Sequence, residues 1–198
     1  MKIVIFLVLL LTGNILFALS QTNYAGFVIQ DNSIGTVNWS GGNPPANAVG
    51  APDEVYAVSG NLDNTTNRYL YATNYGFNIP INAIIAGIVV SPTRHASSAA
   101  DASYDASIRL ITNGIINIAN RAATNFYTTT DVTFDHGSST DTWDVVLSPN
   151  IVNSAGFGTV FAAYKIAAGG GVTISVDSIR IIVYYTLHVR KAMAQTVH

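Results

Sequence analysis

Apolar and polar residues alternate most clearly near the end of the chain, in residues 172–186. The apolar positions are even-numbered up to Val176 and odd-numbered from Ile179 to Tyr185. Successive side chains of a strand point to opposite faces, so each run predicts one buried and one exposed face. The phase changes at Asp177 and Ser178, which requires an inserted residue. We therefore predict a long strand with a β-bulge or sharp bend at these two residues.

A second alternating run lies in the middle of the chain. Ala106, Ile108 and Leu110 are apolar, and the intervening Ser107 and Arg109 are polar. This pattern predicts a strand whose three apolar side chains face the core and whose two polar side chains face water.

Most of the remaining chain consists of short strand-like segments between clusters of Gly, Asn, Asp and Ser. No amphipathic helix of ordinary length separates them, so a β-sandwich or barrel is favoured over βαβ units. Ser148 and Pro149 are typical of the start of a helix, here at most one short turn. The expected strands are residues 26–30, 35–39, 54–59, 68–73, 76–79, 84–90, 104–112, 114–119, 131–134, 143–147, 158–166 and 172–186.

The first 20 residues have the pattern of a secretory signal peptide. Lys2 precedes an apolar run, and small residues surround the expected cleavage point after Ser20. The alternative is an uncleaved membrane anchor, but Thr12, Gly13 and Asn14 interrupt the run and leave it too short to span a bilayer. We expect a secreted protein with one domain over residues 21–186 and a C-terminal tail over 187–198, without a membrane span in the mature chain.

Composition narrows the chemistry. The chain has 198 residues, of which 10% are charged, a formal net charge of −2 and no cysteine. The absence of cysteine excludes disulfides, thiolate metal sites and a cysteine nucleophile. The weak, scattered charge gives no field for nucleic acid or an anionic membrane.

Several motifs resemble a recurrent β-sandwich module of secreted bacterial surface proteins and some phage structural proteins. They are found in residues 47–57, 69–80, 86–90, 107–110, 139–143, 153–158 and 175–186, the last being the most specific. The resemblance covers most of the mature chain, roughly residues 34–186, and implies an all-β, antiparallel, jelly-roll-like sandwich without a shared catalytic site. Pro92 departs from the pattern, so its strand is expected to end early or to lie at an edge. Tyr71 also departs, standing where a polar residue is common.

Aromatic side chains give the best indication of binding. With Leu70 and Ala72 facing inward, Tyr69 and Tyr71 would share the outer face of one strand, where flat rings can stack on sugars. The alternative is that both rings pack against neighbouring strands. Trp39 is expected in the core, as is Trp143.

Acidic residues allow one metal hypothesis. Asp135, Asp141 and Asp144 lie close together in a polar segment, and a structural calcium ion would need such oxygen ligands. The alternative is hydrogen bonding within Asx turns. Asp101 and Asp105 form a second, weaker acidic pair.

Catalytic patterns are weak. Residues 135–139 contain an aspartate, a histidine and two serines, but neighbours on a strand seldom meet, so a polar turn is the better interpretation. The only glutamate is Glu54, and nothing favours a glycosidase pair. We expect a non-catalytic structural or adhesive module whose partner is a glycan, a surface protein or another copy of itself. The alternatives are a carbohydrate-binding module, with or without calcium, and, least favoured, a hydrolase.

Overall fold

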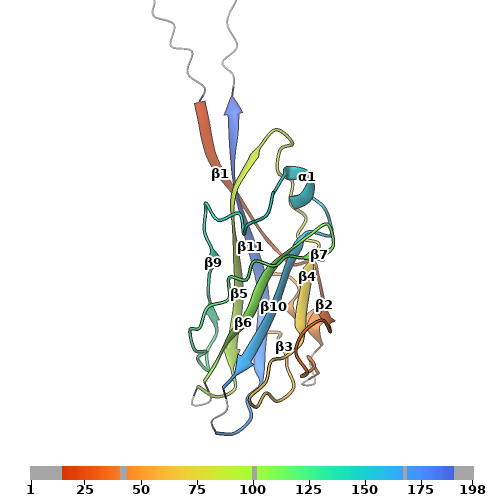
Figure 1. Cartoon of the computed structure of the whole chain (residues 1–198), viewed down its shortest axis with the longest axis vertical. Coiled ribbons are helices and arrows are strands. Elements are labelled where there is room, and N and C mark those ends of the chain that lie inside the picture. Colours follow the sequence, from red (N-terminus) through yellow and green to blue (C-terminus); the bar gives the residue numbers. More distant parts are fainter. Residues whose placement is uncertain (1–14, 41–43, 100–101, 167–168, 190–198) are drawn as a thin grey trace, which may run out of the picture.

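The computed structural model describes residues 15–40, 44–99, 102–166 and 169–189, which fold into two facing antiparallel sheets (Figure 1). Sheet A contains, in order, β1 (Ile15–Tyr24), β11 (Ile174–Val189), β5 (Ile84–Ala96) and β8 (Val132–Thr133), with β3 (Ala57–Val58) beside β11 and β9 (His136–Gly137) beside β5. Sheet B contains β2 (Phe27–Asp31), β4 (Tyr69–Thr73), β10 (Gly158–Lys165), β6 (Ser103–Thr112) and β7 (Ile115–Ile116). The helical segments among these residues are η1 (Pro45–Ala48) and α1 (Pro149–Val152).

The order of the strands is jelly-roll-like. The late strands β10 and β11 lie in different sheets, and each is placed between strands from the beginning and from the middle of the chain. Long connections of this kind characterise Greek-key and jelly-roll sandwiches. The predicted all-β antiparallel sandwich is therefore confirmed. No helix in the described part of the chain has the length and apolar character needed to span a membrane.

The two tryptophans anchor the core between the sheets, as predicted. Trp143 is fully buried and donates its indole N–H to the carbonyl oxygen of Ile88 at 2.9 Å. Trp39 is 3% exposed and donates to the carbonyl oxygen of Arg68 at 2.7 Å. Both rings thus bury apolar area without leaving their one polar group unpaired.

The β-bulge predicted in the last strand is present. The register of β11 against β5 shifts between Val176 and Ser178, so Asp177 is the extra residue. Ile179, like the other odd-numbered apolar residues up to Val183, is buried on the core side. The strand also continues past the expected end at Thr186, because residues 187–189 pair with β1.

The prediction for Ala106 is wrong, because β6 contains a bulge that the apolar pattern did not reveal. The register against β10 shifts at this point, with Ala162 opposite Ser107 and Ala163 opposite Asp105. Ala106 is the extra residue, and it packs on the outer face of sheet B, whereas Ile108 remains in the core. Asp105 consequently faces the core.

Pro92 neither ends its strand nor lies at a sheet edge, because β5 continues to Ala96 with β11 on one side and with β8 and β9 on the other. Its carbonyl oxygen accepts a hydrogen bond from Phe134 N–H, from the segment between β8 and β9. In an antiparallel strand the N–H and C=O of one residue point to the same side. The missing N–H of Pro92 therefore lies on the side where β8 and β9 leave a gap in the ladder.

Other local expectations had mixed outcomes. Ser148 caps α1 by accepting a hydrogen bond from Ile151 N–H, which confirms the short helix. Residues 35–39, 76–79 and 143–147 do not form strands. In the last of these, Trp143 and Asp144 have φ values of 59° and 56°, and this left-handed backbone is incompatible with a strand.

The expected cleavage point between Ser20 and Gln21 lies within β1. Figure 1 shows β1 and β11 side by side, extending beyond the rest of the sandwich at one end. A cut at this bond would leave residues 21–24 paired with residues 180–183 of β11. Residues 1–14 of the expected signal peptide and 190–198 of the expected tail lie outside the described residues.

Candidate binding groove on sheet B

Strand β4 presents its tyrosines to the outer face of sheet B, as the alternation predicts. Leu70 and Ala72 point inward and are fully buried. Tyr69, however, is only 3% exposed, because it belongs to a small apolar cluster on the outer face. Tyr71 is half-buried beside it, and burial together with the nearby Asp31 raises the pKa of its phenol.

The ring of Tyr69 reaches across the sheet. Its hydroxyl lies 2.8 Å from Ser107 Oγ on β6, although β10 separates β4 from β6. The residue of β10 opposite Ser107 is Ala162, whose small side chain leaves room for the ring above it. Cross-strand packing, the alternative interpretation of Tyr69, is therefore correct for this residue, and its hydroxyl forms part of a fixed polar floor.

A groove of about 460 Å³ opens above this floor. Tyr69 and Ser107 line it from below, Arg109 and Tyr164 line it from β6 and β10, and the loop of residues 64–66 adds an asparagine and two threonines. Hydroxyl, amide and guanidinium groups thus converge beside two aromatic rings. A concave surface with a few convergent polar groups is the ordinary form of a small-ligand site.

Arg109 is held in place by neutral groups. Its Nε donates to Ser107 Oγ at 3.1 Å, and Nη1 donates to the carbonyl oxygens of Ile118 at 2.9 Å and Asn117 at 3.4 Å. Ser107 Oγ therefore connects Arg109 with Tyr69. None of these partners is an anion, so within the described residues no carboxylate balances the positive charge of the guanidinium at the groove.

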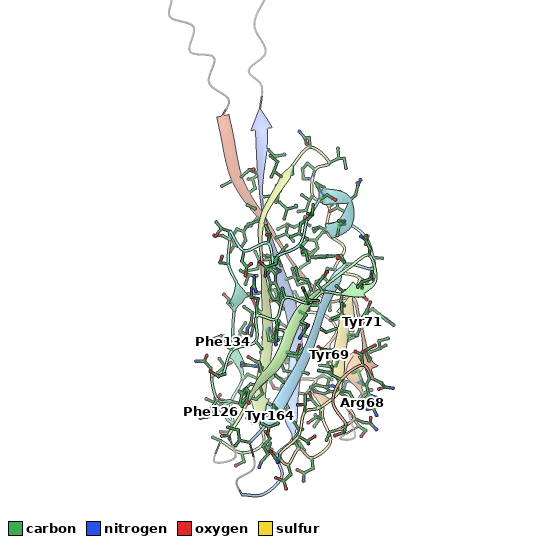
Figure 2. All side chains as sticks on the ribbon, viewed as in Figure 1. Arg68, Tyr69, Tyr71, Phe126, Phe134 and Tyr164 are labelled. Atoms are coloured by element: carbon green, nitrogen blue, oxygen red, sulfur yellow. The ribbon has the colours of Figure 1, made fainter. Side chains whose placement is uncertain are left out.

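An aromatic row continues from the groove. Tyr164 faces Tyr104 across β10 and β6 with ring centroids 5.5 Å apart, and Phe126 follows at 6.4 Å from Tyr104. Phe126 is 61% exposed. The hydroxyl of Tyr164 donates to Asn64 Oδ1 at 2.6 Å, which fixes this ring at the groove wall. Figure 2 shows Tyr71, Tyr69 and Tyr164 following one another along the long axis of the molecule.

Tyr164 and Arg109 were not selected as binding residues from the sequence, although one signal could have identified Tyr164. In β10, Phe161 and Ala163 are buried in the core, so alternation places Val160, Ala162 and Tyr164 on the outer face. Arg109 was expected to face water on the same side as Ser107, but its hydrogen bonds to the carbonyl groups of Asn117 and Ile118 depend on chain pairing that alternation does not give.

The three aspartates of the calcium hypothesis are not brought into one group. Asp141 accepts two hydrogen bonds from Arg121, at 2.7 and 3.1 Å, and Asp144 accepts one at 3.1 Å. The hydrogen bond from Arg121 lowers the pKa of Asp141. Asp135 instead accepts a hydrogen bond from Ser91 at 2.6 Å. Within the described residues no three histidine, aspartate or glutamate side chains are placed to share a metal ion; structural calcium stays a prediction.

The second acidic pair is divided, because Asp101 lies outside the described residues and Asp105 is buried between the sheets. Arg94 donates to both carboxylate oxygens of Asp105, at 2.8 and 2.7 Å, and Tyr127 donates its hydroxyl at 2.6 Å. The Arg94 guanidinium also lies 4.2 Å from the centre of the Tyr127 ring. Burial by itself would raise the pKa of Asp105, but the hydrogen bonds from Arg94 and the nearby His136 outweigh it and lower the pKa.

His136 completes this buried ion cluster of Arg94, Asp105, Tyr127 and His136. Its Nε2 lies 3.3 Å from Asp105 Oδ2, and its Nδ1 lies 2.8 Å from the carbonyl oxygen of Arg121. The polar-turn interpretation of residues 135–139 is thus wrong for His136, which is 2% exposed. The two ring nitrogens of His136 face the Asp105 carboxylate and the Arg121 carbonyl group. The hydroxyl of the nearby Ser138 instead accepts a hydrogen bond from Thr140 N–H.

Another polar group lies on the outer face of sheet A. Asp131 accepts hydrogen bonds from the Tyr56 hydroxyl at 2.8 Å and lies 2.7 Å from His95 Nδ1. The hydrogen bond to Asp131, with some burial, raises the pKa of Tyr56 to about 12. This group fastens the segment before β3 to the sheet.

The chain was compared with protein-family models, curated proteins and solved structures. The resemblance to modules of bacterial surface and phage proteins stays a prediction. No protein-family model matches the chain, and neither a curated protein nor a solved structure is similar enough to match it.

Proposed function

We infer that the chain is a secreted, non-catalytic adhesive module that binds carbohydrate in the groove on the outer face of sheet B. The observation that carries this proposal is the convergence around one open groove of Tyr164, Arg109, the amide of Asn64 and the hydroxyl-bearing residues 65, 66 and 107. The signal-peptide pattern supports its placement outside the cell.

The chemistry of the groove suits a sugar chain. A sugar ring has apolar C–H faces and a rim of hydroxyl groups, so it needs an aromatic surface beside hydrogen-bonding groups. Tyr164 and Tyr104 offer the first, and Asn64, Thr65 and Thr66 offer the second. The groove is open to solvent, and its aromatic wall is already fixed by the hydrogen bond from Tyr164 to Asn64.

The second candidate is a structural role through a protein partner or another copy of the chain. One observation favours it. Phe27 and Ile29 on β2 are 49% and 43% exposed, and β2 is at one end of the strand order of sheet B. Exposed apolar residues on an edge strand favour pairing with another chain.

A glycan array with the purified chain, followed by calorimetry on the best binder, tests the leading candidate. Tyr164→Ala should weaken binding by about tenfold or more, since it removes a stacking surface and the contact that orients Asn64. The matched control is Tyr184→Ala, on the opposite sheet. Equal losses in both variants would contradict the groove as the site, and a chain that binds no glycan while forming oligomers would favour the second candidate.

A further inference from the structure

The described arginines differ in whether a carboxylate lies close to the guanidinium. Arg94, Arg121 and Arg180 each lie within 4 Å of an aspartate oxygen. Arg109 has no such partner among the described residues, although it has three hydrogen bonds to neutral oxygens. Its positive charge is therefore fixed in position at the groove and not neutralised by the protein itself.

The fork of Arg109 is prepared for a ligand. Nε and Nη1 are occupied by Ser107 and by the carbonyl groups of Asn117 and Ile118, and these contacts set the plane of the guanidinium. Nη2 makes no hydrogen bond to the described residues. A carboxylate or sulfate oxygen that meets a guanidinium already held in one plane forms a charge-assisted hydrogen bond, with less loss of side-chain entropy.

The surroundings limit the kind of anion. Beside Arg109 the groove carries the hydroxyl groups of Thr65 and Thr66, which suit the hydroxyl groups of a sugar, above the buried and mutually bonded hydroxyls of Tyr69 and Ser107. A single guanidinium in a chain of net charge −2 does not suit a polyphosphate such as nucleic acid, which needs many cations. One anionic group on an otherwise neutral, polyhydroxylated residue fits this arrangement.

We propose that the groove selects an acidic sugar residue, whose carboxylate or sulfate binds Nη2 of Arg109 while its ring lies against Tyr164. This selectivity rests on the proposed carbohydrate function and adds the class of glycan to it. The anionic group of the sugar and the Arg109 guanidinium form an ion pair at an open surface, so binding weakens as salt is added.

Calorimetry with four related probes tests the proposal: an oligogalacturonate, its methyl ester, a neutral galactose oligomer and a sulfated galactose oligomer. At low salt the native chain should bind at least one acidic probe about tenfold more tightly than its uncharged counterpart. Preference for the sulfated probe identifies sulfate as the anion, and preference for the galacturonate identifies carboxylate.

Variants assign the preference to one side chain. Arg109→Gln should abolish this preference, so that it binds an acidic probe no more tightly than the uncharged counterpart, and Arg109→Lys, which keeps the charge without the fork, should keep part of it. Arg68→Gln is the matched control, because Arg68 also lacks a carboxylate within 4 Å among the described residues but does not line the groove. Thermal melting of each variant shows whether it is folded.

Three results would overturn the proposal. The native chain could bind charged and uncharged probes equally, Arg109→Gln could keep the preference, or Arg68→Gln could remove it as fully. Each of these leaves carbohydrate binding itself intact, whereas failure of all four probes and of the wider array would remove the proposed function as well.

Discussion

Asp105 and Arg109 are on the same strand, β6, yet they occupy opposite environments. Asp105 lies between the sheets, where Arg94 and Tyr127 satisfy its carboxylate. Arg109 lies on the outer face, where only neutral oxygens contact it. The bulge at Ala106 causes the difference, because two odd-numbered positions of a regular strand would face the same side.

The difference between Asp105 and Arg109 shows how burial determines whether a charged side chain needs partners within the protein. Between the sheets an unmatched ion is strongly destabilising, so the protein itself supplies partners to both oxygens of the Asp105 carboxylate. On the outer face water can solvate the guanidinium, so it can remain unmatched and available to a ligand. The buried ion cluster fixes the structure, and the groove is free to bind.

Replacing either Arg94 or Arg109 by glutamine should give the largest difference in stability between the two environments. Arg94→Gln leaves Asp105 buried without its guanidinium and should lower the free energy of unfolding by about 3–5 kcal/mol. Arg109→Gln should lower it by about 1 kcal/mol or less, because its site is open to water. Chemical denaturation measures both values. Similar losses would mean that the two environments do not differ as described.

Two buried tyrosines sharpen the comparison at the level of one hydroxyl. Tyr127→Phe removes a donor to the charged Asp105 and should reduce stability by about 1.5–3 kcal/mol. Tyr75→Phe is the control, because the buried Tyr75 hydroxyl has no hydrogen-bond partner among the described residues. It should change stability by about 0.5 kcal/mol or less, or increase it. Equal effects in denaturation would show that the Tyr127 hydroxyl does not stabilise the cluster.

The smallest predicted effect is a loss of folding stability that is absent at neutral pH and develops only in acid. The pKa of Asp105 is lowered in the folded protein, so below about pH 4 the unfolded chain binds a proton that the folded chain does not. The stabilisation that Asp105 contributes is therefore fully present above the pKa it has in the unfolded chain, and it is lost as the pH falls through the pKa it has in the folded protein. Unfolding free energies measured from neutral to acidic pH should show this loss, and it should be shallower in Arg94→Gln. A steeper loss in the variant would contradict the role of Arg94.

Local alternation predicted much of the fold. It gave the inward faces of β4 and β11, and the change of phase revealed the bulge at Asp177, because both sides of that bulge carry long apolar runs. The bulge at Ala106 left no such trace. Alanine is compatible with either face, and the three β6 residues before it, Ser103, Tyr104 and Asp105, contain no alternating apolar run, so the sequence could not show that an acidic side chain is directed into the core.

The groove was harder to predict, because it depends on pairing between distant segments. Tyr69 meets Ser107 only because β10 brings β4 and β6 together, and Ala162 leaves space for the ring. Tyr164 meets Asn64 across a separation of 100 residues. The pairs His136–Gly137 and Val132–Thr133 are also set by their neighbour β5 and not by local pattern.

Chemical-shift mapping by NMR, with an acidic oligosaccharide titrated into the labelled chain, tests most directly whether the groove of sheet B is the binding site. Saturable shifts should be concentrated at residues 64–66, Tyr69, Ser107, Arg109 and Tyr164, and in Arg109→Gln they should saturate only at an about tenfold higher ligand concentration. Shifts centred instead on His95 and Asp131 of the opposite face, or saturable binding with an undisturbed groove, would contradict this site.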